Sequence, residues 1–234
     1  MTDSPLIWER PEPAERSTPS PLSRARIVRA AIVLADSAGL DAVSLRKVAG
    51  ALDAGPMRLY RYVDTKDELL TLMVDAIVAE IPAPAGPTWD AVLRSIATGL
   101  RDTVLRHPWF ADLLGGRPYV GPATLARGEA ALSALRATGL DDLDTITSAL
   151  ATLDAYLIGA VRKEIAEHRA QEETGLDQRQ WQHANGPYLT RMFATGRYPA
   201  LEEWVHDARH LKAAEAFELG LGYLLAGIAS SLPR

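Results

Sequence analysis

Residues 44–66 of this 234-residue chain combine the residue types that DNA-binding helices use to contact bases and phosphates. Their sequence, SLRKVAGALDAGPMRLYRYVDTK, predicts two short helices around a tight turn. The second helix carries four cationic or aromatic side chains: Arg58, Tyr60, Arg61 and Tyr62. Such a helix fits the major groove of DNA, where base edges can be read. The pattern therefore favours a helix-turn-helix unit and a regulator that binds DNA.

The charge of the chain is distributed unevenly. The net charge is −5 at pH 7, yet residues 22–66 hold eight Lys or Arg and four Asp, so this segment carries +4. Residues 1–21 carry −2 and residues 67–234 carry −7. A basic segment on an acidic body is typical of a protein with one DNA-facing end.

Composition limits the class of protein. No apolar run approaches the ~20 residues that a membrane helix needs, and the N-terminus lacks the apolar core of a signal peptide. Because the chain has no cysteine, it can form no disulfide and no Cys-based metal site. We expect a cytoplasmic protein that uses no metal and no cofactor.

Four helices are expected to position the basic segment. Ser23 and Ser44 can cap the first and second, and Pro56 suits the first turn of the third. Thr65-Lys66-Asp67-Glu68 has the capping-box pattern of a fourth. The expected spans are about 23–38, 44–52, 56–63 and 65–80.

Proline-rich breaks predict the domain organisation. Residues 1–22 hold five prolines and no helical periodicity, which predicts a disordered N-terminal arm. Residues 23–66 are expected to form the helix-turn-helix domain and residues 67–81 a connecting helix. Beyond the Pro-rich break that ends at Pro87, residues 88–234 are expected to form a larger helical body.

Apolar residues spaced three or four apart predict helices throughout the body, and no segment alternates like a half-buried strand. The fold class is therefore expected to be all-α. The body helices are expected at about 89–106, 109–114, 122–138, 141–172, 177–195 and 212–231, with Gly186-Pro187 interrupting the fifth. The last helix is apolar on most sides. We expect helices 141–172 and 212–231 to form a homodimer contact, with central burial inside one subunit as the alternative.

The order of these elements, and the string RLYRYVDTKDELL at residues 58–70, resembles the tetracycline-repressor (TetR) family of transcriptional regulators. The match is strongest over residues 23–80. RHPWFADLLGGRP (106–118) and FELGLGYLLAGI (217–228) resemble the C-terminal domain of the tetracycline-repressor type. The resemblance implies a homodimer that binds a palindromic operator on double-stranded DNA, most often as a repressor. It also implies a pocket in each body for a small-molecule inducer that releases the DNA.

Within this resemblance, Arg46 lies where the family places a DNA-contacting arginine, and arginine can bond guanine O6 and N7 together. Arg58 and Arg61 lie three residues apart and share a helix face. Lys66 is expected to contact phosphate at a helix N-terminus, and core packing is the alternative role of Tyr60. The expected DNA contacts are Ser44, Arg46, Arg58, Tyr60, Arg61, Tyr62 and Lys66.

Aromatic side chains with a polar tip suit a pocket for a mostly apolar ligand, although each of them can instead be plain core. The expected ligand contacts are Met73, Trp89, Leu93, Ile96, His107, Trp109, Phe110, Tyr119, Asp154, Tyr156, Tyr188, Met192 and Phe193. Tetracycline-binding members hold a magnesium-tetracycline complex partly through histidine. The matching positions here are Pro82 and Leu113, so tetracycline is not the expected inducer.

Two other classes of protein compete with this interpretation. An enzyme is not expected, because the chain has no P-loop, nucleophile elbow or dinucleotide fingerprint. Residues 164–168, Glu-Ile-Ala-Glu-His, lack the second Glu-x-x-His that a metal-carboxylate bundle requires. A helical interaction module without specific DNA binding remains the alternative.

Overall fold

The structure, a computed structural model, describes residues 5–13 and 21–231. Within these residues every regular element is helical, which agrees with the predicted all-α class. Contacts divide the chain into two compact units, Met1–Ile158 and Gly159–Arg234. No helix in the described part of the chain is long and apolar enough to cross a membrane.

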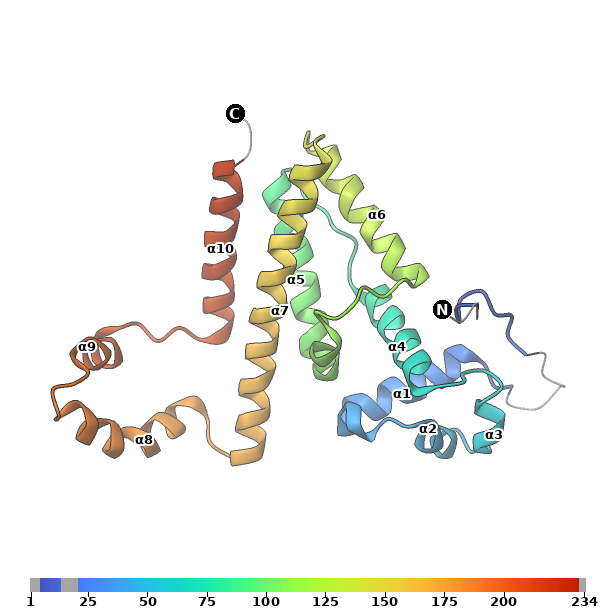
Figure 1. Cartoon of the computed structure of the whole chain (residues 1–234), viewed down its shortest axis with the longest axis horizontal. Helices are drawn as coiled ribbons and strands as arrows, with labels where there is room; N and C mark the ends of the chain where they lie inside the picture. The colour runs from blue at the N-terminus through green and yellow to red at the C-terminus, as the bar shows by residue number, and fades with distance from the viewer. Residues whose placement is uncertain (1–4, 14–20, 232–234) are drawn as a thin grey trace. The chain divides into compact units, whose positions relative to one another are not determined.

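The first unit begins with the head and continues into the body (Figure 1). It contains α1 (Arg24–Ala38), the 3-10 turn η1 (Leu40–Ala42), α2 (Leu45–Ala51), α3 (Pro56–Leu59), α4 (Lys66–Glu80), α5 (Trp89–Arg106), the 3-10 helix η2 (Pro108–Leu113), α6 (Pro122–Ala137) and the first half of α7 (Leu143–Thr174). The second unit contains the rest of α7 together with α8 (Gln178–Phe193), α9 (Pro199–Asp207) and α10 (Ala213–Ser231).

Side-chain caps begin the helices of the head where the sequence predicts them. Ser23, Ser44 and Thr65 each accept the backbone N–H three residues later, at 3.2, 3.2 and 3.1 Å. These bonds satisfy donors that the first helical turn leaves unpaired. Glu68 departs from the expected capping box, because its Oε2 accepts the N–H of Asp64, at 2.8 Å, two positions before the helix begins.

The third helix is shorter than predicted. It ends at Leu59 rather than near Val63, and the residues that follow form turns. The N–H groups of Tyr62 and Val63 both bond the carbonyl of Leu59, at 2.8 and 3.0 Å. Because Leu59, Tyr62 and Val63 are all buried, the chain curls into the core of the head instead of continuing as a helix.

The second unit differs from the sequence analysis in two places. Gly186-Pro187 does not interrupt α8, which continues through Pro187. Side-chain bonds support this stretch, since Asn185 Nδ2 donates to the carbonyl of Trp181 at 2.8 Å and Thr190 Oγ1 donates to the carbonyl of Gly186 at 3.0 Å. Helix α9 was not predicted, although Leu201, Trp204 and Val205 have the spacing of one helix face; none of its residues is buried.

The long helices carry the apolar stripes that their spacing predicts. In α7 the buried apolar residues are Ile146, Ala149, Leu153, Leu157, Val161 and Ile165. In α10 they are Phe217, Leu221, Leu225 and Ile228. Leu219 and Tyr223 of α10 are 44% and 70% exposed, so the second apolar side of this helix is open to solvent in the single chain.

Residues 5–13 differ from the disordered arm that the sequence predicts. Ile7 is buried and Arg10 forms ion pairs with Asp64 and Glu68 on the head. One buried apolar side chain and two ion pairs hold this segment against the head, although it contains prolines. Residues 1–4 and 14–20 of the predicted arm lie outside the described residues.

Helix α4 links the head to the body of the first unit, since it packs against both α1 and α6 (Figure 1). Its buried carboxylate Asp75 caps the start of α6. Asp75 Oδ2 accepts the N–H of Ala123 at 3.1 Å, and Oδ1 accepts the N–H and hydroxyl of Thr124 at 2.9 and 3.0 Å. A negative charge at a helix N-terminus is stabilising, particularly when it is partly buried.

A substitution at Gly121 tests how much the Asp75 cap contributes to stability. A β-carbon at Gly121 would lie 2.1 Å from Asp75 Oδ1, so Gly121→Ala must displace the carboxylate from α6. We expect the free energy of unfolding to fall by ~1–3 kcal/mol, the usual cost of unpaired buried donors and acceptors. Urea unfolding followed by circular dichroism measures the change.

Gly128 provides the matched control for Gly121. It lies at an exposed position of α6, where an added β-carbon would meet nothing within 4 Å. Because alanine favours helix over glycine by up to ~1 kcal/mol, Gly128→Ala should keep or raise stability. Equal stability changes in the two variants would contradict a special role for the Asp75 cap.

Candidate DNA-binding face and effector pocket

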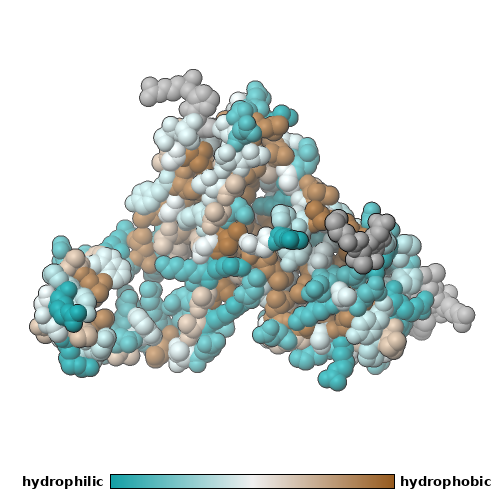
Figure 2. Space-filling view, viewed as in Figure 1, coloured by the Kyte–Doolittle hydropathy of each residue, from teal (hydrophilic) through white to brown (hydrophobic). Residues whose placement is uncertain are grey.

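Exposed cationic and aromatic side chains gather on the three helices that the sequence assigns to DNA binding. Arg46 and Lys47 come from α2, Tyr60 and Arg61 follow α3, and Lys66 begins α4. The inward residues of α2 are buried, so its polar residues turn outward. Hydrophilic side chains cover much of the visible surface of this part of the molecule (Figure 2). The face offers guanidinium, ammonium and phenol groups, which suit phosphates and base edges.

Three of the predicted DNA contacts are less accessible. Ser44 is half-buried and uses its hydroxyl to cap α2, while Arg58 is half-buried at the end of α3. Tyr62 is only 2% exposed. A ring buried to this degree cannot present a surface to a phosphate or a thymine methyl group, so in this structure Tyr62 packs within the head.

The residues predicted to contact a ligand fall into several environments. Met73, Leu93, Trp109 and Phe110 are almost fully buried in the first unit. The Trp109 and Phe110 rings meet edge to face, with centroids 6.2 Å apart. The half-buried ones in the first unit are Trp89, Ile96, His107, Tyr119 and Tyr156. In the second unit Phe193 is buried, Met192 is half-buried and Tyr188 is 56% exposed.

Two of these predicted residues carry perturbed ionisable groups. Desolvation, with a smaller contribution from the charge of Asp67, raises the pKa of the Tyr119 hydroxyl. Desolvation also raises the pKa of the Asp154 carboxyl, although this residue lies at an exposed position of α7. In both cases the loss of hydration disfavours the charged form of the group.

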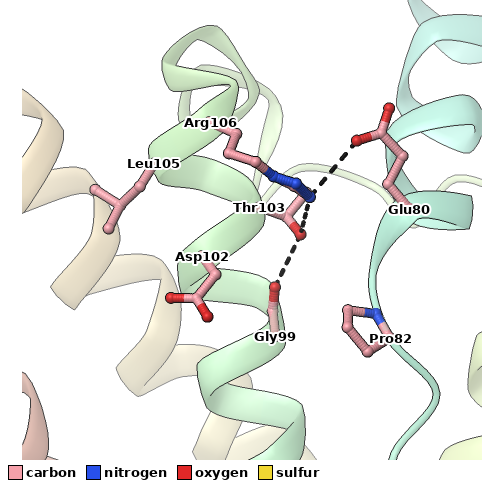
Figure 3. A pocket seen from close by; sticks show the side chains of 7 residues that line it. All are labelled: Glu80, Pro82, Gly99, Asp102, Thr103, Leu105 and Arg106. Carbon is pink, nitrogen blue, oxygen red and sulfur yellow. Dashed lines mark hydrogen bonds and ion pairs between the residues drawn. The ribbon is translucent and has the colours of Figure 1, made fainter.

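A pocket of about 360 Å³ opens between the end of α4 and the second half of α5 (Figure 3). Its volume falls in the range of small-molecule sites. The lining residues are Glu80, Pro82, Gly99, Asp102, Thr103, Leu105 and Arg106. None of the ligand contacts predicted from the sequence lines it, but Pro82, which the sequence analysis placed at a histidine position of tetracycline-binding members, does.

Arg106 organises the polar side of this pocket (Figure 3). Its Nη2 lies 3.5 Å from Glu80 Oε2 and donates to Thr103 Oγ1 at 3.1 Å. The Thr103 hydroxyl in turn donates to the carbonyl of Gly99 at 2.9 Å. The pocket therefore presents the Arg106 cation beside the apolar surface of Pro82, and the buried Thr103 hydroxyl helps to hold the guanidinium in place.

Glu80 also belongs to a second set of contacts, here called the His107 cluster: Asp36, Glu80, His107 and Trp109. His107 Nδ1 lies 2.8 Å from Asp36 Oδ1, and its Nε2 lies 3.2 Å from Glu80 Oε2. Trp109 Nε1 donates to Asp36 Oδ1 at 2.7 Å. The cluster joins α1 of the head to α4 and to the start of η2, directly beside the pocket.

The sequence identified His107 as a polar group of interest but gave no signal for Asp36 or Glu80. Both acids lie near the ends of helices, where charged residues are usually solvated.

The second unit contains a further pocket of about 300 Å³ between the end of α7 and the start of α8, with Trp181 in its lining.

Residues 81–232 match the sequence profile of the family described as "Tetracyclin repressor-like, C-terminal domain". The chain belongs to the TetR family of transcriptional regulators. Among TetR-family relatives, the HTH-type transcriptional repressor DrrR1 of Streptomyces coeruleorubidus is 36% identical over 205 residues, which cover 86% of this chain and 76% of the relative. An HTH-type transcriptional regulator of Saccharopolyspora erythraea is 35% identical over 227 residues, covering 96% of this chain and 92% of the relative.

Solved TetR-family structures agree with the fold. The crystal structure of the Streptomyces coelicolor protein ActR in complex with actinorhodin has a TM-score of 0.76 and 28% identity, and covers 92% of this chain and 99% of that chain. This likeness confirms the predicted helix-turn-helix head followed by a larger helical C-terminal domain. As a TetR-family member the protein is a transcriptional regulator and not an enzyme.

Proposed function

We propose that this TetR-family regulator binds a palindromic DNA operator as a homodimer and represses transcription until a small molecule binds. The observation that carries the proposal is the exposed set of Arg46, Lys47, Tyr60, Arg61 and Lys66 on the helix-turn-helix head. In helix-turn-helix dimers the two half-sites lie ~34–36 Å apart, one turn of DNA. A homodimer with two-fold symmetry presents two identical heads, and a palindromic operator offers them two identical half-sites.

The exposed side of α10 supports the homodimer. Leu219 and Tyr223 are large apolar side chains left open to solvent in the single chain. Covering them with a second copy would remove apolar surface from water, which favours association. Gly222 and Gly227 of the same helix leave open space around their α-carbons, so a partner helix can approach closely.

The pocket beside Arg106 supports a small-molecule effector. Pro82 offers apolar surface, while Arg106 offers guanidinium N–H donors. This lining suits a mostly apolar compound with one acidic or hydrogen-bond-accepting group. The relative ActR has been solved with actinorhodin. Tetracycline is not proposed, because Pro82 cannot replace a histidine that helps to hold a metal-linked drug.

Glu80 provides a route from this pocket to the head. An effector that takes Arg106 from Glu80 alters the contacts of Glu80 with His107, and through His107 those of Asp36 on α1. Effectors act by binding two conformations with different affinity, and such coupling is typically ~1–3 kcal/mol. We infer that the His107 cluster is one of the contacts that differ between those conformations.

The test of the proposed function is selection of bound sequences from a random DNA library at ~150 mM salt, near physiological ionic strength. A palindromic motif with half-sites about one helical turn apart is the expected result. Binding that falls steeply with salt but enriches no motif would favour the alternative, a helical interaction module without operator specificity. Repeating the selection after unfolding, ligand removal and refolding removes any effector carried through purification.

A second experiment tests whether the effector binds in the pocket beside Arg106. Compounds that raise the melting temperature of the protein are tested for release of the selected operator. A compound that releases DNA from the wild type but not from Thr103→Val or Arg106→Ala places the effector in the pocket. Full release from both variants would move the effector site elsewhere.

A further inference from the structure

We propose that Arg10, in the segment before the first helix, positions the DNA-binding face and offsets part of the negative charge of two carboxylates beside Lys66. This inference rests on the proposed DNA binding. The carboxylates are Asp64 and Glu68, which lie two residues before and two residues after Lys66. Arg10 is a positioning residue, since it acts through these neighbours and not by contacting DNA itself.

The contacts of Arg10 span the start of α4. Its Nη1 donates to Asp64 Oδ2, and its Nη2 donates to Glu68 Oε1 at 2.5 Å. The Arg10 side chain is only 24% exposed. A guanidinium that uses two nitrogens for two carboxylates is held in one orientation, and charge-assisted bonds of this type are stronger than neutral ones.

Arg24 connects the same segment to the turn that follows α3. Its Nη1 donates to the carbonyl of Arg10 at 2.6 Å, and its Nε donates to the carbonyl of Tyr62 at 3.2 Å. Its backbone N–H donates to Glu12 Oε1 at 3.0 Å. With Ile7 buried, these bonds brace the turn between α3 and α4 from the N-terminal side.

The charge of the segment matters because of where Asp64 and Glu68 lie. The proposed face must approach a phosphate backbone, and Asp64 keeps 58% of its side chain exposed. Two uncompensated carboxylates around Lys66 would repel phosphate and offset the attraction of the ammonium group. In the docked segment the single positive charge of Arg10 is shared between both, which halves their net negative charge and limits this repulsion.

The test compares operator binding by the full-length chain with and without Arg10. Arg10→Ala is expected to weaken binding roughly 5- to 30-fold at ~150 mM salt, the effect of one or two phosphate-neutralising charges. Arg10→Lys should retain most of the affinity because it keeps the charge. Arg209→Ala is the matched control, since it removes an arginine that is paired with Glu215 in the second unit, and it should leave affinity unchanged.

A second variant separates the charge effect of Arg10 from its structural effect. Adding Asp64→Asn and Glu68→Gln to Arg10→Ala removes the two carboxylates and should restore most of the lost operator affinity. If Arg10 acted only by holding the segment on the head, the affinity would not return. Failure of this rescue, or unchanged affinity in Arg10→Ala, would overturn the inference. If the wild type itself selects no operator, the proposed function fails instead, and with it the basis of this inference.

Discussion

Trp109→Ala is expected to lower the free energy of unfolding by ~3–5 kcal/mol, the usual cost of removing a large buried aromatic side chain. The indole is 1% exposed and packs edge to face against Phe110. Its N–H also donates to Asp36 on α1 at 2.7 Å. The substitution therefore leaves a cavity beneath η2 and removes one of the bonds that join η2 to the head. Urea unfolding followed by circular dichroism gives the size of the change.

Trp109→Phe separates the two contributions. It keeps much of the ring but removes the N–H, so it should cost ~1.5–3 kcal/mol, as for a hydrogen bond to a charged group. If the His107 cluster helps to set the position of the head, this variant should also change the release of operator by an effector. If both variants lowered the free energy of unfolding equally, the cavity left by Trp109→Ala would contribute nothing to its effect.

Arg46→Ala and Lys66→Ala are expected to weaken operator binding in different ways. Arg46→Ala should cost ~1–3 kcal/mol, about 5- to 150-fold, and relax the preference for one base, because arginine reads guanine through two hydrogen bonds. Lys66→Ala should weaken binding to all sequences about equally and lower the salt slope by about 1, because its expected partner is a phosphate. Titrations over a range of salt concentrations with the selected operator and single-base variants measure both effects.

Lys163 offers a control for these two variants. It is an exposed cation on α7 in the second unit, outside the helix-turn-helix head. Lys163→Ala removes one charge without touching the proposed face and should leave both affinity and salt slope unchanged. If Arg46→Ala kept the base preference of the wild type, Arg46 would not be a base-reading residue.

The helices of this protein were predictable because their signals are local. Ser23, Ser44 and Thr65 cap the helices that follow them, as their place before apolar periodic segments predicts. The apolar stripes of α7 and α10 follow from residues three or four apart. The string at residues 58–70, together with the order of the helices, indicated the TetR family. The caps and the stripes depend on residues within one or two helical turns of their neighbours in the pattern.

The tertiary structure alone decided which side chains meet. Arg10 pairs with Asp64, 54 residues away, and His107 contacts Asp36, 71 residues away. Tyr62 lies in the sequence pattern of a DNA contact, yet it is buried because the turn after α3 directs it inward. The pocket at Arg106 lies where α4 and α5 approach, and none of the aromatic residues chosen from the sequence lines it. Helical periodicity reports which face of a helix is buried, but it carries no information on which distant polar residue that face will meet.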